Sequence, residues 1–426
     1  MVRLHLRYFL LSLGGMLLSS GGYAQVFNLS EYCLPSSNDV AITINKLLEN
    51  GDVFIPTGYW KLSSKICLPS GRMLKGEGRE NTILWAEEPL RMVEVRGNDN
   101  VVSDIYFKGT NSTDKASYLI FKVKGTKNLM VSDCTFEGAT GGVFIDAVCD
   151  SIKILNCLFR NMYLVKTPSS YGYGIVMNHN DKTKDRGTFY GLIEGNVFEQ
   201  TVFRHALYLQ SSENIVVRNN IFYGSNEKKP TGYEYMVNLR GCRHLVFEGN
   251  HTYQGYGFIN GVASEYHGKG ADIIIENNIF EDNTLNPHGL GIINMKFHQM
   301  TVRGNTFREC NTLGIYVATA NNGIIEKNVF EESRQESFPA ISISKRRISS
   351  LKIKDNVFQM GNKAESIAID VSRSRFSKLE ITGNDFNGDG IGIHFEKNLI
   401  LEYNSAKNTF KGRLEEARGN VVLQRK

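Results

Sequence analysis

The sequence predicts an all-β fold, a single-stranded right-handed parallel β-helix of about twelve coils with a short N-terminal capping helix. A motif Asn-x-Phe recurs along the chain, and successive aromatic residues in its frame are mostly 23 to 31 residues apart. Short runs rich in Ile, Val and Leu flank each motif, without a helical pattern of a dozen residues between them. The motif begins at Asn196, Asn220, Asn278, Asn305, Asn328, Asn356, Asn384 and Asn408.

Residues 1–24 have the pattern of a secretory signal peptide. Arg3 and Arg7 precede an apolar run at residues 8–18, and a small-residue cleavage site ends at Ala24. The first cysteine, Cys33, lies too far beyond this run for a lipoprotein signal. No other stretch is apolar enough to cross a bilayer. We therefore expect a secreted or periplasmic protein without a membrane anchor.

Residues 25–426 are predicted to form a single β-helix domain, in which residues 25–90 make the N-terminal cap and the first coils. The ends of an open β-helix expose strand edges, which proteins usually cover. Residues 39–48 can form a short amphipathic helix with Asn38 or Asp39 as its N-cap, and this helix is expected to cover the first coil. The polar chain after Phe410 is expected to cover the last one.

The repeated Asn and Phe residues have different expected roles. Asn tolerates left-handed backbone angles in tight turns, and stacked Asn side chains can form an amide ladder. The Phe rings are expected to stack inside the coils. Cys134 and Cys157 occupy the Asn column in two early coils. In the coil whose motif lacks Phe, Tyr253 is expected to fill the aromatic column and His251 the Asn column.

Charge and cysteine content narrow the range of partners and cofactors. The formal net charge of +5 falls to 5 − 2 = +3 without Arg3 and Arg7, which is too mild to indicate a nucleic-acid partner. Seven cysteines without a CxxC pair make a zinc site improbable. Cys33 and Cys67 are candidates for a bridge near the cap. We expect a monomer without a cofactor, with calcium as the alternative left open.

Residues 51–84 resemble the opening of the pectate-lyase-like right-handed β-helix superfamily. The matching pieces are the run GDVFIPTGYW, then LPSG, then KGEG. This resemblance implies the β-helix fold but does not select a reaction, because polysaccharide lyases, glycoside hydrolases, epimerases and phage tailspikes share it.

Subfamily motifs favour a lyase. The segment Asn238-Leu239-Arg240-Gly241 resembles the Arg-bearing coil of alginate and dermatan lyases, although Gly241 replaces their His and no matching Lys stands on the preceding coil. The polygalacturonase-type motifs Asn-x-Asp, Asp-Asp and Gly-His-Gly are absent. Residues 285–288 (LNPH) match only part of the epimerase motif and lack its acid.

Alternation along the second strand of six consecutive coils predicts two outward columns on one face. We expect this face to be walled by the long loops at residues 163–186, 224–235, 263–270 and 283–289. The first column reads Val176, Tyr208, Asn238, Asn260, Asn294 and Tyr316. The second reads Asn178, Gln210, Arg240, Val262, Lys296 and Ala318.

This face predicts β-elimination of an acidic polysaccharide such as a glycosaminoglycan, alginate or pectin. The reaction needs neutralisation of the uronate carboxylate, a base for the C5 proton and a donor for the leaving oxygen. Arg240, Asn238 and Asn294 suit neutralisation, while Lys296, Tyr208 and His205 are candidate bases or acids. His267 is a second candidate acid or base on a loop. The expected substrate-binding residues are Asn178, Gln210, Asn238, Asn260, Asn294 and His267.

Other interpretations of the same residues stay open. A glycoside hydrolase needs two carboxylates, which loop residues Asp181, Asp185, Glu234 and Glu265 can supply. A non-catalytic carbohydrate-binding or adhesive β-helix would use the same strip without cleaving a bond. Outward positions on a β-helix are also often merely solvated, so Lys296 can equally be a surface lysine and Tyr208 a packing residue.

Overall fold

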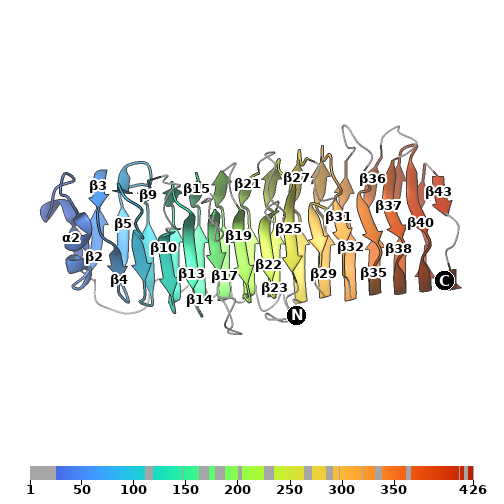
Figure 1. The fold of residues 1–426 in the computed structure, drawn as a ribbon, viewed down its shortest axis with the longest axis horizontal. Helices are drawn as coiled ribbons and strands as arrows, with labels where there is room; N and C mark the ends of the chain where they lie inside the picture. The colour runs from blue at the N-terminus through green and yellow to red at the C-terminus, as the bar shows by residue number, and fades with distance from the viewer. Residues whose placement is uncertain are drawn as a thin grey trace.

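The computed structural model shows a right-handed parallel β-helix of about twelve turns, in which three parallel sheets run the length of the molecule (Figure 1). It describes residues 25–110, 119–146, 148–162, 172–177, 188–199, 204–224, 235–262, 271–284, 291–296, 298–319, 321–331, 338–360, 366–411, 413–416 and 421–425. From β2 onward, each strand pairs in parallel with the strand three places later, so each turn contributes one strand to each sheet. The predicted fold class is confirmed.

The three sheets are named A, B and C. Sheet A contains β1 (Val26–Asn28), β2 (Asp52–Ile55), β5 (Met73–Gly76), β8 (Asn100–Ser103), β11 (Lys127–Ser132), β14 (Asp150–Leu155), β17 (Phe189–Glu194), β20 (Glu213–Arg218), β23 (Arg243–Glu248), β26 (Ala271–Glu276), β29 (His298–Arg303), β32 (Asn321–Glu326), β35 (Arg347–Lys354), β38 (Arg375–Thr382), β41 (Leu399–Asn404) and β44 (Val421–Arg425). Sheet B contains β3 (Gly58–Leu62), β6 (Thr82–Ala86), β9 (Tyr106–Lys108), β12 (Thr135–Glu137), β15 (Leu158–Arg160), β18 (Val197–Glu199), β21 (Ile221–Tyr223), β24 (His251–Tyr253), β27 (Ile279–Glu281), β30 (Thr306–Arg308), β33 (Val329–Phe330), β36 (Val357–Gln359), β39 (Asp385–Asn387) and β42 (Thr409–Phe410). Sheet C contains β4 (Ile66–Leu68), β7 (Val93–Val95), β10 (Leu119–Lys124), β13 (Gly141–Asp146), β16 (Tyr173–Met177), β19 (His205–Gln210), β22 (Tyr235–Arg240), β25 (Gly257–Val262), β28 (Ile293–Met295), β31 (Ile315–Val317), β34 (Ile341–Ser344), β37 (Ile367–Ser372), β40 (Ile391–Glu396) and β43 (Arg413–Glu416).

The N-terminal end of the stack is covered by helix α2 (Val40–Leu48), which follows the short 3-10 helix η1 (Leu29–Glu31). Asp39 is the N-cap of α2, because its side chain accepts a hydrogen bond from the Ala41 backbone N–H. The apolar face of α2 is buried against β2, β3 and β4 of the first coil. The predicted capping helix is thus confirmed. The predicted signal peptide, residues 1–24, lies outside the described residues.

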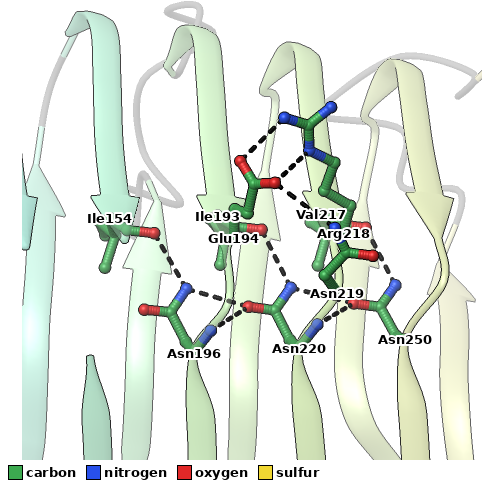
Figure 2. Close-up of polar contacts among 9 residues, drawn as sticks. All are labelled: Ile154, Ile193, Glu194, Asn196, Val217, Arg218, Asn219, Asn220 and Asn250. Atoms are coloured by element: carbon green, nitrogen blue, oxygen red, sulfur yellow. Dashed lines mark hydrogen bonds and ion pairs between the residues drawn. The ribbon is translucent and has the colours of Figure 1, made fainter. Parts of the chain in front are cut away.

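Asn side chains form a continuous ladder from Asn196 to Asn408 at the turn between sheets A and B. In Figure 2, the Asn196 backbone N–H and Nδ2 both donate to Asn220 Oδ1, at 2.9 and 3.0 Å. The Asn220 Nδ2 also donates to the Ile193 carbonyl at 3.0 Å. Every amide atom of Asn220 is therefore bonded, and Asn250 continues the pattern on the next coil. The predicted ladder is confirmed, with the Cys157 N–H donating to Asn196 as its first step.

Two details of the repeat differ from prediction. The left-handed residue is the one before each ladder Asn, such as Gly195 with φ 67° and Asn219 with φ 55°, and not the ladder Asn itself. The aromatic frame also slips in one coil. Thr252 is the register partner of Phe222, while Tyr253 pairs with Tyr223 outside the core. The expectation that Tyr253 fills the aromatic column was therefore wrong.

All seven cysteines lie in the described part of the chain, and all seven are free thiols. Cys33 and Cys67 therefore do not form the bridge suggested by the sequence. Cys134 and Cys157 are fully buried, as predicted for the Asn column. Among the described residues, helices are too short or too polar to span a membrane.

Candidate functional site

The outward column predicted on the second strands exists in sheet C. Tyr208, Asn238 and Asn260 are register partners on β19, β22 and β25, and Asn294 on β28 follows them. In the same column, Val176 precedes Tyr208 and Tyr316 follows Asn294. The three consecutive residues Asn238, Asn260 and Asn294 are called the Asn row. The residues between these positions, such as Leu207 and Val237, are fully buried in the core. Alternation along the strands thus brings residues more than a hundred positions apart onto one face.

The second column is only partly described. Gln210 pairs with Arg240, which in turn pairs with Val262. Lys296 directly follows β28 and lies two coils from Arg240, which corresponds to roughly 10 Å along the axis. Asn178 and His267 lie outside the described residues. The four loop carboxylates at positions 181, 185, 234 and 265 also lie outside them.

This face is more enclosed than outward strand positions normally are. Asn238, Asn260 and Asn294 are 4%, 7% and 0% exposed. His205, Tyr208 and Gln210 are also buried, whereas Arg240 and Lys296 are half-buried. Burial on this scale makes the hydrogen-bond partners of each polar group decisive for what the site can bind.

His205 is held by both of its ring nitrogens. Its Nδ1 lies 2.7 Å from the Tyr235 backbone carbonyl oxygen, and its Nε2 lies 3.2 Å from Asn238 Nδ2. Because a carbonyl oxygen can only accept, Nδ1 carries a proton. In the neutral ring, Nε2 then accepts from the amide of Asn238. The structure brings His205 to the predicted site, but in contact with the backbone and the Asn row.

Tyr208 and Arg240 come together on neighbouring coils. The Arg240 guanidinium carbon lies 5.4 Å from the centre of the Tyr208 ring, in cation–π geometry. The Tyr208 hydroxyl donates to Gln210 Oε1 at 2.9 Å. The Tyr173 ring, 5.5 Å from that of Tyr208, continues this aromatic wall on the preceding coil. The predicted residues Tyr208, Gln210 and Arg240 therefore form one contiguous cluster.

Tyr235 is a site residue that the sequence analysis missed. It is the first residue of β22, and its ring crosses the next coil at Gly257. A Cβ at position 257 would lie 2.5 Å from the ring atom Cε1, so only glycine leaves room for the ring. The Asn294 Nδ2 donates to the Tyr235 hydroxyl two coils away. A Tyr followed by a Gly in the same column of the next coil is a signal that could have indicated this crossing.

A carboxylate surrounded by cations lies near the N-terminal end of the same face. Glu94, the register partner of Lys122 on β10, accepts hydrogen bonds from Lys65 at 2.5 Å and from Arg96 at 2.7 Å. The Nη1 atom of Arg91 lies 3.8 Å from Glu94 Oε2. The Lys65 hydrogen bond and the neighbouring Arg96 lower the pKa of Glu94 to about 2. This part of the face is therefore richer in cations than in free anions.

Nucleophilic and metal chemistry find little support in this region. Cys242 lies two residues after Arg240, but burial raises the pKa of its thiol to about 12, so the thiol stays protonated. The described residues of β16, β19, β22, β25 and β28 include neither Asp nor Glu. Groups of three or more His, Cys, Asp or Glu suited to a metal were not found within the described ranges.

Two family models match parts of the chain. The model described as "Right handed beta helix region" matches residues 165–294, and the model described as "Periplasmic copper-binding protein (NosD)" matches residues 231–421. Each covers less than half of the 426 residues. A search of curated proteins found none with significant similarity.

Solved structures with the same fold cover most of the chain. A tailspike protein mutant of E. coli bacteriophage HK620, in complex with a hexasaccharide, has a TM-score of 0.60 and 15% identity over 93% of this chain and 78% of its own. PfbA, a surface adhesin of Streptococcus pneumoniae, has a TM-score of 0.56 and 15% identity over 87% and 93%. DFA-IIIase from Arthrobacter chlorophenolicus A6, in complex with DFA-III, has a TM-score of 0.53 and 12% identity over 79% and 95%.

The structural similarity establishes the fold, but identities of 12 to 15% leave the activity open. The strand register, the β-helix family model and these structures agree with the resemblance found at residues 51–84. The chain therefore has the right-handed parallel β-helix fold, which is consistent with its resemblance to the pectate-lyase-like superfamily.

Proposed function

We propose that this chain binds an acidic polysaccharide along the outer face of sheet C and cleaves it by β-elimination. The observation that carries the proposal is the cluster of Tyr208, Gln210 and Arg240 beside the Asn row, all on consecutive coils. The cluster offers a cation, aromatic rings and amides, which together suit a uronate sugar. The hexasaccharide bound to the similar tailspike supports a carbohydrate as the ligand of a β-helix such as this one.

The proposed chemistry assigns charge neutralisation to Arg240. A guanidinium paired with the uronate carboxylate withdraws electron density and stabilises the charge that develops as the C5 proton leaves. The base takes this proton, the C4–O bond breaks, the electron pair forms the C4–C5 double bond, and a donor protonates the leaving oxygen. Lys296 and Tyr208 are the proposed base and donor. His205, with both ring nitrogens held, is proposed to position the Asn row.

A hydrolase is the competing enzyme. Its mechanism needs two carboxylates about 5 to 9.5 Å apart across the scissile bond. The described strands of this part of sheet C carry none, which favours elimination. A non-catalytic saccharide-binding or adhesive protein is the third candidate, and one of the similar structures is a surface adhesin. The copper named in one family model forms no part of the proposal, because the described residues gather no three-ligand cluster.

Export is part of the same proposal. A polysaccharide substrate lies outside the cytoplasm, and the signal-like residues 1–24 fit such a location. One of the two matching family models describes a periplasmic protein, which agrees with export. Signal cleavage after Ala24 would appear as a shortened N-terminus in the mass of the protein purified from the periplasm or medium.

The test is incubation of the purified protein with alginate, polygalacturonate, dermatan sulfate and hyaluronan, with and without calcium. Elimination produces an unsaturated uronate, which is followed by its ultraviolet absorbance. New reducing ends without this absorbance would identify a hydrolase, and binding without either product a saccharide-binding protein.

Two variants connect a lyase to the sheet C face. Arg240→Ala and Lys296→Ala are expected to lower turnover by about a hundredfold or more with an unchanged thermal midpoint. Ser342→Ala, further along the same face in the column of Tyr316, serves as the matched control. Normal turnover in both site variants would move the reaction away from this face.

A further inference from the structure

Three Asn side chains on sheet C share an unusual hydrogen-bond state. The Oδ1 atoms of Asn238, Asn260 and Asn294 are buried and have no hydrogen-bond partner among the described residues. The ladder Asn residues in the same molecule, such as Asn220, have all their amide atoms bonded. A buried carbonyl left without a donor costs about 1–3 kcal/mol. Three such oxygens on consecutive coils therefore need an explanation other than coil stacking.

The orientation of Asn238 is set by His205. Because His205 Nδ1 donates to the Tyr235 carbonyl oxygen, its Nε2 presents a lone pair to Asn238. Only the amide N–H₂ group can face that lone pair favourably. The N–H₂ group of Asn238 therefore points to His205, and its Oδ1 is the atom left for another partner.

A different device sets the orientation of Asn294. The Tyr235 ring crosses Gly257 and brings its hydroxyl to Asn294, whose Nδ2 donates to it. Asn294 Oδ1 is again the atom without a described partner. Two unrelated contacts, one from an imidazole and one from a phenol, thus turn two amides of the row the same way.

We propose that the row of Asn238, Asn260 and Asn294 is a pre-oriented array of hydrogen-bond acceptors that recognises the hydroxyl groups of successive sugars. The row has a repeat of about 4.8 Å per coil, which is close to the length of one sugar unit in an extended chain. A ligand of this row must donate, as a sugar hydroxyl does and a carboxylate does not. The inference rests on the saccharide-binding part of the proposed function.

This assignment changes the role expected for two residues. The sequence suggested that Asn238 and Asn294 neutralise the uronate carboxylate with their amide N–H groups. The N–H₂ group of Asn238 is hydrogen-bonded to His205, and that of Asn294 to Tyr235. Neutralisation of the uronate carboxylate is therefore assigned to Arg240 alone. Sugars whose hydroxyls are acetylated cannot donate to the row, and their ester oxygens would face the Asn oxygens. The site should therefore select polymers with free hydroxyls.

The experiment compares each polymer of the panel with its own chemically O-acetylated form, by titration calorimetry on the full chain. For the polymer that binds, acetylation is expected to weaken binding by about tenfold or more, since several hydrogen bonds are lost. In Asn260→Leu, the free polymer is expected to bind about fivefold to tenfold more weakly, and the difference between free and acetylated polymer is expected to shrink. Tyr235→Phe should give a smaller loss of the same kind.

The controls separate this inference from the proposed function. Ser342→Ala should bind and discriminate as the wild type does, and circular dichroism with thermal melting checks the fold of every variant. Tyr235→Phe keeps the test decisive if Asn260→Leu does not fold. A wild type that binds no polymer would overturn the proposed function itself. Equal binding of free and acetylated polymer, or unchanged discrimination in folded variants, would overturn only the acceptor row.

Discussion

Phe258 fills the place in the aromatic core that Thr252 is too small to occupy. Thr252 is level with Phe222 and Phe280 in sheet B, whereas Phe258 enters the core from β25 of sheet C. Its ring centre lies 5.3 Å from those of both Phe222 and Phe280. The aromatic stack therefore continues through this coil with a ring that comes from sheet C instead of sheet B.

Removal of the Phe258 ring should destabilise the protein strongly. Phe258→Ala leaves a cavity between two rings, which is expected to lower the free energy of unfolding by about 3–5 kcal/mol. Tyr253→Ala, at the position that the sequence assigned to the core, should cost less than about 1 kcal/mol because Tyr253 faces outward. Urea unfolding followed by circular dichroism measures both changes. Similar losses in the two variants would contradict the observed packing.

Loss of one ladder Asn should cost more than loss of a nearby ion pair. Asn220→Ala removes the acceptor for two N–H groups of Asn196 and the donor to Ile193, and is expected to destabilise by about 3 kcal/mol or more. Glu194→Gln, on the preceding coil, is the matched control. Glu194 forms a partly exposed ion pair with Arg218, in which Oε1 lies 2.7 Å from Nε (Figure 2). This ion pair should contribute less than about 1 kcal/mol to the free energy of unfolding. Thermal midpoints of both variants provide the comparison.

The repeat made most of the fold predictable. Asn-x-Phe sets the register of most coils, and side-chain alternation then places Asn238 and Asn294 on one face. The slip at Thr252 was missed because Tyr253, one residue later, offered a more obvious aromatic. The correct frame was nevertheless present, since Asn250 stands two residues before Thr252, as in the other coils.

The site was harder to predict than the fold because alternation fails at the start of β22. Met236 and Val237 both pack into the core, so Tyr235 emerges on the outer face against the simple two-residue period. The orientations of the Asn amides depend on His205 and Tyr235, one and two coils away. Such contacts cannot be read from local sequence. The sequence analysis therefore treated Asn238 and Asn294 as N–H donors, whereas their Oδ1 atoms are the ones without a described partner.

Glu94 should make stability depend on pH in the acid range. Its pKa is lowered from the ordinary value of about 4.5 to about 2, so its contribution is fully present above about pH 5 and is lost as the pH falls toward 2. Glu94→Gln is expected to be less stable than the wild type by about 1–3 kcal/mol at pH 7, and the gap should narrow toward pH 2. Glu87→Gln, in an exposed pair with Lys61, is the control and should show little change. A gap for Glu94→Gln that is constant between pH 7 and pH 2 would show that its carboxylate does not interact as described.

The Tyr235 crossing predicts a coupling between positions 235 and 257. In Gly257→Ala, the new Cβ would overlap the ring, and the expected cost in unfolding free energy is about 1–3 kcal/mol. In a Tyr235→Ala background, the nearest remaining atom is the Gly291 carbonyl oxygen at 3.4 Å, an ordinary contact, so the same substitution should be nearly neutral. A double-mutant cycle from urea unfolding therefore should give a coupling energy of about 1 kcal/mol or more. The cycle separates this clash from any general intolerance of alanine at position 257, because such intolerance would cost the same in both backgrounds and leave no coupling.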